Sequence, residues 1–88
     1  MKFANGAMVK IRSWEDMAAE YNSNENEIET GAAVFTRSMK PLCGKKAIVE
    51  EIEGDKFYKL RPMRIEDMLL DWDWSFTDEM LEQVKADE

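Results

Sequence analysis

The chain has 88 residues, a length at which we expect one small domain, residues 1–88, with a single modest core. It contains no histidine and one cysteine, Cys43, which excludes an internal disulfide and the usual zinc-ligand sets and removes the commonest general base. The net charge is −7, and no stretch of the sequence has the run of apolar residues that a membrane span needs. We therefore expect a cytoplasmic protein that is not an enzyme, has neither metal nor cofactor, and carries no signal peptide.

The first predicted element is a strand over residues 7–12. Polar and apolar side chains alternate there, which places Val9 and Ile11 on the buried face. Ser13 then has the residue type and position of a helix N-cap, and two acids follow it in the first turn, where they suit the helix dipole. The helix is short and must be held by docking one apolar stripe, formed by Trp14, Met17, Ala18 and Tyr21.

A polar stretch follows, over residues 22–30, with Ile28 as its one apolar residue. We expect a mobile loop that ends in a short extended piece. Residues 31–35 predict a strand edge, after which Thr36 can cap one helical turn that Pro41 and Gly44 stop.

The clearest signal in the chain is a hairpin within residues 44–62. Two runs of β-favouring residues, 47–52 and 57–60, flank a turn at 53–56 that contains Gly54 and Asp55. Because a lone hairpin is barely stable in water, these strands need further strands to pack on.

The last third of the chain is less regular. We expect a loop over residues 63–70 and then a strand over 70–74, where two acids alternate with two tryptophans, so that one face is acidic and the other aromatic. A closing turn or short helix should follow, with Met80, Leu81 and Val84 on its inner side, and residues 85–88 should fray.

The order of these motifs resembles that of small uncharacterised proteins encoded by phages and prophages. The motifs are Val-Lys-Ile-Arg at 9–12, Ser-Trp-Glu-Asp-Met at 13–17, Phe-Thr at 35–36 with Met39 and Cys43-Gly44-Lys45, and Trp72 and Trp74 followed by Met80-Leu81-Glu82. The resemblance covers nearly the whole chain, except that residues 60–70 are longer and more apolar. It implies a mainly β fold with minor α structure: a small SH3-like β-barrel whose long first loop, residues 13–35, holds a short helix. It implies no particular chemistry.

Acidic and aromatic residues form the candidate binding set. Acidic and basic residues lie in separate blocks along the chain, and the acidic blocks favour partners with a basic surface. The acids at 71 and 73 are not followed by the glycine and the bidentate acid that a calcium-binding loop has at fixed spacing, which argues against a metal site there. In the leading interpretation both tryptophans fill the barrel; in the alternative, Trp72 or Trp74 lies in an exposed groove that receives a peptide or partner side chain. The C-terminal acidic block belongs to the set, whose named members are Glu50, Glu51, Glu53, Asp55, Asp71, Trp72, Asp73 and Trp74.

Basic residues form a second, weaker candidate. If the hairpin brings them together, they can contact phosphates, with Phe57 or Tyr58 as a stacking platform for bases. The larger acidic excess opposes nucleic-acid binding. The set consists of Arg37, Lys40, Lys45, Lys46, Lys56, Lys59, Arg61 and Arg64.

These observations favour function by binding. The leading hypothesis is a phage or mobile-element accessory protein that binds a host or phage protein with a basic surface and inhibits a nucleic-acid-targeting defence system, because spaced carboxylates can imitate a phosphate backbone. One alternative is a structural or assembly accessory module. The other is a weak nucleic-acid-binding module.

Overall fold

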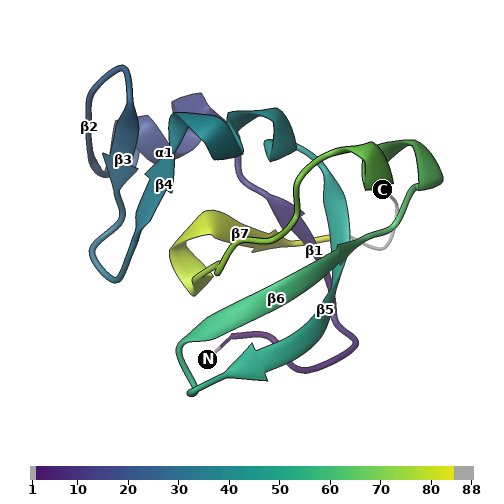
Figure 1. Ribbon diagram of the computed structural model, residues 1–88. Coiled ribbons are helices and arrows are strands. Elements are labelled where there is room, and N and C mark those ends of the chain that lie inside the picture. The colour runs from purple at the N-terminus through teal and green to yellow at the C-terminus, as the bar shows by residue number, and fades with distance from the viewer. Residues whose placement is uncertain (1, 85–88) are drawn as a thin grey trace.

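The computed structural model describes residues 2–84 and shows a mainly β protein with two antiparallel sheets. The larger sheet has the strand order β6-β5-β1-β7, and the smaller has the order β2-β3-β4. Figure 1 shows the small sheet on one side of the molecule and the large sheet on the other, with α1 and η1 beside the small sheet. The mainly β expectation is confirmed. The expected fraying at 85–88 lies outside the described residues.

Strand β1 (Met8–Ile11) and helix α1 (Trp14–Glu20) form as their sequence patterns predict. Val9 and Ile11 are fully buried at the centre of the large sheet, between β5 (Lys46–Glu53) and β7 (Leu81–Gln83). The Ser13 hydroxyl accepts a hydrogen bond of 3.1 Å from the Asp16 N–H and caps α1. Met17 of the helix is fully buried.

The segment predicted to be a loop, residues 22–30, is instead a small hairpin. Strands β2 (Asn22–Ser23) and β3 (Glu27–Glu29) pair, and β3 also pairs with β4 (Val34–Thr36). The Asn24 side-chain oxygen accepts hydrogen bonds from the backbone N–H groups of Asn26 and Glu27 at 2.7 and 3.1 Å, which closes the turn. Ile28 anchors the hairpin because it is fully buried opposite Phe35. The expected extended piece is therefore present, but within a sheet.

The central hairpin is confirmed. Strand β5 pairs with β6 (Phe57–Pro62), with a register shift between Val49 and Glu51. Gly54 and Asp55 both adopt positive φ, 59° and 58°, and the Lys56 N–H bonds to the Glu53 carbonyl at 3.1 Å. Positive φ at two successive turn residues matches the twist of the flanking strands.

Two expectations fail between β6 and β7. Residues 65–69 form a 3-10 helix, η2 (Ile65–Leu69), where a loop was predicted, and no strand forms at 70–74. The Asp71 carboxylate accepts a hydrogen bond of 3.0 Å from the Asp73 N–H, which folds the chain into a local turn in place of an extended ladder. A single bridge then joins Phe76 to Tyr58 of β6.

The expected closing turn is present as a 3-10 helix, but the residues after it form a strand, β7, that was not predicted. A 3-10 helix, η3 (Asp78–Met80), leads into β7, and Met80 and Leu81 are buried. Val84 is half-buried at the limit of the described residues. Before β5, another 3-10 helix, η1 (Arg37–Leu42), follows Thr36, but the Thr36 side chain makes no capping hydrogen bond and Pro41 lies inside the helix.

Within residues 2–84 neither sheet is closed, so the expected SH3-like barrel is not confirmed. Phe76 forms a bridge with Tyr58 of β6, at one edge of the large sheet. The chain then crosses to the other edge, where strand β7 pairs with β1. Both sheets contribute to one core, whose largest fully buried side chains include Tyr58, Phe35 and Phe76.

Candidate functional site

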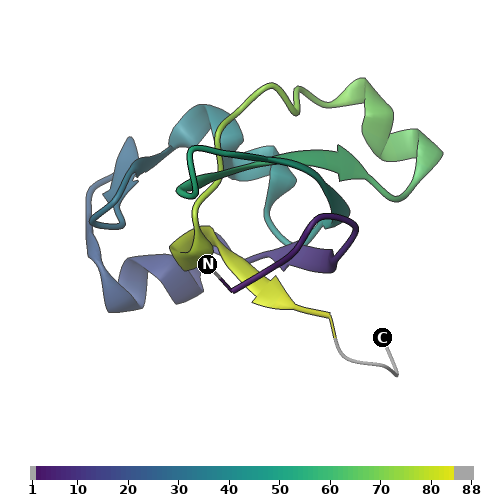
Figure 2. The same ribbon diagram turned by 90° about the horizontal axis from the view of Figure 1, so that it is seen from below.

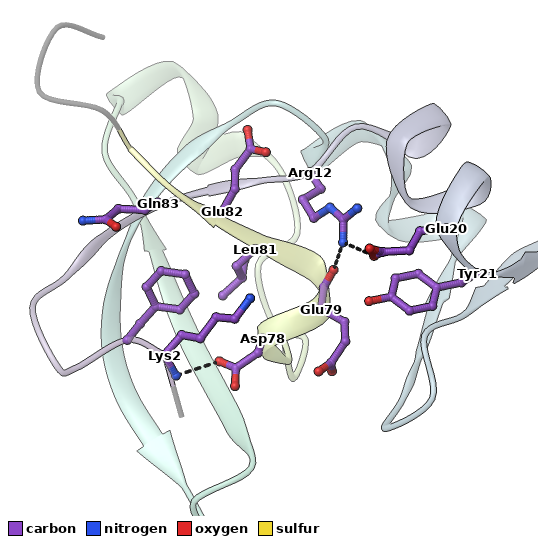
Figure 3. A pocket seen from close by; sticks show the side chains of 10 residues that line it. Lys2, Arg12, Glu20, Tyr21, Asp78, Glu79, Leu81, Glu82 and Gln83 are labelled. Carbon is purple, nitrogen blue, oxygen red and sulfur yellow. Dashed lines mark hydrogen bonds and ion pairs between the residues drawn. The ribbon is translucent and has the colours of Figure 1, made fainter.

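An open cleft of about 630 Å³ lies where the end of α1, the N-terminal segment, η3 and β7 meet. Figure 3 shows the side chains of Arg12, Glu20, Tyr21 and Glu79 around one end of this space, with Lys2 and Asp78 at the other. We call it the acidic cleft. Its lining consists of Lys2, Phe3, Arg12, Glu20, Tyr21, Asp78, Glu79, Leu81, Glu82 and Gln83.

Arg12 is built into the wall of the acidic cleft. Its guanidinium donates to the carboxylates of Asp16 and Glu20 at 2.8 and 2.9 Å and to the Glu79 carbonyl at 2.8 Å. It also lies 5.8 Å from the centre of the Tyr21 ring, a cation–π distance. Arg12 thus connects β1 to α1 and to η3, and its positive charge is already matched by two carboxylates.

The same contacts change the proton affinity of the groups involved. The hydrogen bonds from Arg12 lower the pKa of the Asp16 and Glu20 carboxyls, and the bond to Asp16 raises the pKa of Arg12 itself. Burial raises the pKa of Tyr21. Near neutral pH the two carboxylates and the guanidinium are therefore charged, and Tyr21 is neutral.

A second network supports the floor of the acidic cleft. The fully buried Tyr58 donates its hydroxyl hydrogen bond to the Asp78 carboxylate and accepts one from the Phe3 N–H at 3.1 Å. The Lys2 N–H donates to the same Asp78 oxygen at 3.2 Å. Burial, followed by the Asp78 hydrogen bond, raises the pKa of Tyr58. Asp78 therefore fixes the N-terminal segment against β6.

A neighbouring hollow of about 390 Å³ extends this surface toward the tip of the central hairpin. Asp55 and Lys56 of the hairpin turn line it together with Asp78 and Glu79, which also line the acidic cleft. Three elements thus bring carboxylates to one continuous region. We call this region the acidic surface; it consists of Glu20, Asp55, Asp78 and Glu79.

The acidic surface is suited to binding a cationic group. Glu20 and Asp78 already accept hydrogen bonds from Arg12 and Tyr58, so the carboxylates of Asp55 and Glu79 are the ones that a further ammonium or guanidinium group can contact. Glu79 contributes only its carbonyl to the Arg12 network, so its carboxylate is not committed to that contact.

The structure divides the predicted binding set. Glu50 and Glu51 are exposed on β5, and Asp55 at the turn belongs to the acidic surface. Lys59 lies between Glu53 and Asp73, at 3.8 and 3.7 Å from their carboxylates, and so brings the two halves of the predicted set together.

Trp72 and Trp74 were predicted to share one face of a strand. This prediction is wrong, because no strand forms there. Both are half-buried against the core, and their indole N–H groups donate to the backbone carbonyls of Asp67 and Asp71 at 2.8 and 3.0 Å. Neither side chain therefore forms a mainly exposed aromatic surface. Through its indole hydrogen bond, each helps to hold the turn that follows η2.

The predicted basic set does not form one patch with its aromatic platform. Of the two candidate platforms, Tyr58 is fully buried and cannot stack on a base, and Phe57 is half-buried. Lys45 pairs with the buried Asp67 at 3.3 Å, and Lys40 lies 5.2 Å from the centre of the Trp14 ring. Lys59 is engaged by two acids.

Sequence reasoning missed Arg12 and Tyr21 as members of the site. The acids at 78 and 79 entered only as part of a C-terminal acidic block. The signal was weak because the cleft joins residues far apart in the chain, and Arg12 looked like the last polar residue of an alternating strand.

Among the described residues, no group of three or more His, Cys, Asp or Glu side chains is placed to hold a metal ion, and none of the helices has the length and apolar character needed to cross a bilayer. Burial raises the pKa of the Cys43 thiol to about 11. Comparison of the chain with protein-family models, curated proteins and solved structures finds no match.

Proposed function

We propose that the protein is a non-catalytic interaction module that docks on a basic partner protein through the acidic surface. The observation that carries this proposal is the meeting of Glu20, Asp55 and Glu79, from three separate elements, around two adjoining hollows. A lysine or arginine of the partner would enter the acidic cleft beside Tyr21. Net charge of −7 would speed encounter with a basic surface, in a salt-dependent way.

The finer form of the proposal adds the architecture and the biological setting. The strand order, with the Phe76 segment reaching both edges of the large sheet, supports an SH3-like barrel that is not closed by a continuous ladder. The motif resemblance supports a phage or mobile-element accessory protein acting in the bacterial cytoplasm. Its partner would be a host protein with a basic groove, such as a nucleic-acid-targeting defence enzyme, which the acidic surface would occupy.

Affinity capture tests the proposal. Immobilised protein is incubated with nuclease-treated bacterial lysate, and bound proteins are identified and then eluted with rising salt. We expect a basic host protein that elutes by about 0.5 M salt, where charge interactions are screened within a few ångströms.

Two variants make the capture specific to the acidic surface. Glu79→Lys and Asp55→Lys should abolish capture. Glu25→Lys should retain it, because this substitution makes the same charge change outside the acidic surface, in the turn between β2 and β3. Equal capture by all variants would contradict the proposal. Recovery of phage structural proteins alone would favour the assembly role, and direct binding of purified DNA or RNA would favour the nucleic-acid role.

A further inference from the structure

A cluster of large apolar side chains lies in water on and beside η2. Ile65 is 84% exposed, Leu69 is 93% exposed and Met68 is 63% exposed, and Met63 just before the helix is 40% exposed. Among residues 2–84, Met8 and Val34 are the other large apolar residues that are exposed, at 44% and 41%. A gathering of this kind within seven residues is typical of an interaction site, since soluble proteins rarely leave contiguous apolar patches uncovered.

The η2 segment is held in place by Asp67 although its apolar side chains are free. The Asp67 carboxylate is buried and pairs with Lys45, and the Asp67 carbonyl accepts hydrogen bonds from the Leu70 N–H and the Trp72 indole N–H at 3.1 and 2.8 Å. The apolar side chains are therefore presented by an ordered support. Binding to such a support loses less conformational entropy than binding to a flexible loop.

Basic residues surround this cluster. In the large sheet, Met8, Ile48 and Arg61 are register partners on the face opposite the buried Val9 and Ala47. Lys10 and Lys46 are paired in the next row of the same face. Lys46 also lines a hollow of about 230 Å³ together with Arg64 and Glu66, which connects the sheet face to η2.

We call this region the basic–apolar surface. Its four bases, with Lys45, outnumber the three acids beside them: Glu66 lies 3.7 Å from Arg64, Asp67 pairs with Lys45, and Glu82 is opposite Lys10 in the strand register. It consists of Met8, Lys10, Lys46, Ile48, Arg61, Met63, Arg64, Ile65, Met68 and Leu69.

We propose that the basic–apolar surface docks an acidic segment of a partner protein that carries large apolar side chains. Apolar side chains of the segment would cover Ile65 and Leu69, and its carboxylates would face Arg61 and Arg64. The charge of the surface decides the class of ligand: a basic segment, which the acidic surface would attract, is repelled here.

Two other occupants are less well supported by the charges. An anionic membrane would gain only about 1 kcal/mol for each base near the lipid surface. A second copy of the chain would bring together two molecules of net charge −7. Both are outcomes that the experiment distinguishes.

The η2 part of the basic–apolar surface is separate from the acidic surface, although Glu82 lines the acidic cleft and is also the register partner of Lys10. Figures 1 and 2 show η2 and η3 well apart in both views, with η2 projecting from the end of β6. The inference does not rest on the proposed function, and a chain that uses both surfaces would connect a basic partner to an acidic one.

The test uses a displayed library of random peptides selected on the full chain. We expect the enriched peptides to combine Asp and Glu with Leu, Ile, Phe or Trp. Their affinity, measured by fluorescence anisotropy, should fall at least about tenfold for the Ile65→Ser/Leu69→Ser variant and for Arg61→Glu/Arg64→Glu. Val34→Ser, which alters an exposed apolar residue of the small sheet, should bind like the wild type.

Several results would overturn the inference. These are enrichment of basic peptides only, no enrichment at all, or enriched peptides that bind the Ile65→Ser/Leu69→Ser variant as well as the wild type. Co-sedimentation with phosphatidylserine vesicles that the double variant loses would assign the surface to a membrane. A concentration-dependent dimer in sedimentation velocity, also lost in the double variant, would assign it to a second copy.

Discussion

The acidic cleft and the η2 segment place polar and apolar groups in opposite ways. In the cleft, charged side chains are tied into the fold: Arg12 bonds to three groups, and Asp78 receives the hydroxyl of the buried Tyr58. On η2, Ile65 and Leu69 lie in water. The difference teaches that stability and binding can be separated by substitution. Changes in the cleft should weaken the fold, and changes to the exposed apolar side chains of η2 should leave it intact.

The largest loss is expected for Arg12→Met. The variant removes hydrogen bonds that join β1, α1 and η3, although the partner carboxylates of Asp16 and Glu20 are about half exposed and stay hydrated. We expect the free energy of unfolding to fall by about 2–3 kcal/mol, mostly from the lost bond to the Glu79 carbonyl and from lost packing. Urea titration measures this, with Arg37→Met, an exposed arginine of η1, as the matched control.

The same variant should alter the response to acid. Because Arg12 lowers the pKa of Asp16 and Glu20, these carboxyls contribute stability above their ordinary pKa values, 3.8 and 4.5, and the contribution is lost as pH falls through the lowered values. Arg12→Met should remove that part of the acid sensitivity. Identical slopes of stability against pH below about pH 5 in variant and wild type would contradict the assignment.

Tyr58→Phe should have the next largest effect. It removes the hydroxyl that joins Asp78 to the Phe3 N–H, at a cost of about 1–2 kcal/mol. Because the folded pKa of Tyr58 is raised, its contribution is complete below the ordinary tyrosine value of 10.0 and is lost as pH rises through the raised value.

Thermal unfolding between neutral and alkaline pH checks this assignment. The wild type should lose stability above about pH 10 more steeply than Tyr58→Phe. Tyr21→Phe is the control, since Tyr21 also has a raised pKa but lacks the bond to Asp78. Parallel curves for wild type and Tyr58→Phe would show that the Tyr58 hydroxyl does not titrate with unfolding.

Local patterns in the sequence predicted the elements that depend on neighbouring residues. Alternation located β1, the Ser13 cap located α1, and Gly54 with Asp55 located the turn of the central hairpin. The predicted strand at 70–74 had the right alternation but was wrong, because the Asp71 carboxylate bonds to the Asp73 N–H and closes a turn. Alternation alone does not show whether a partner strand is available.

The site was harder to predict because it is assembled from distant segments. Charge blocks identified Asp55 and the C-terminal acids, but nothing local indicated that Arg12 would reach Glu79 or that Tyr58 would reach Asp78. The polar segment at 22–30 shows the same limit: one apolar residue, Ile28, was enough to anchor a hairpin once Phe35 lay opposite.

A smaller loss is expected at the support of η2. Asp67→Ala removes the carboxylate that pairs with Lys45 but keeps the carbonyl that holds Trp72, so the free energy of unfolding should fall by about 1 kcal/mol. Glu66→Ala, which removes an exposed partner of Arg64 at 3.7 Å, should change it by no more than a few tenths. Equal effects of the two variants in urea titration would mean that Asp67 does not anchor the segment.

The smallest effect on folding should come from Ile65→Ser/Leu69→Ser. This variant is the sharpest test of the difference between the acidic cleft and the η2 segment. Both side chains are already in water in the folded protein, so their substitution loses little buried apolar area. The free energy of unfolding should therefore change by less than about 0.5 kcal/mol. A loss comparable to that of Arg12→Met would show that these side chains pack into the fold, and the η2 surface would then be part of the core and not a docking site. Unchanged urea and thermal midpoints, together with weakened peptide binding, would show that the exposed cluster serves association alone.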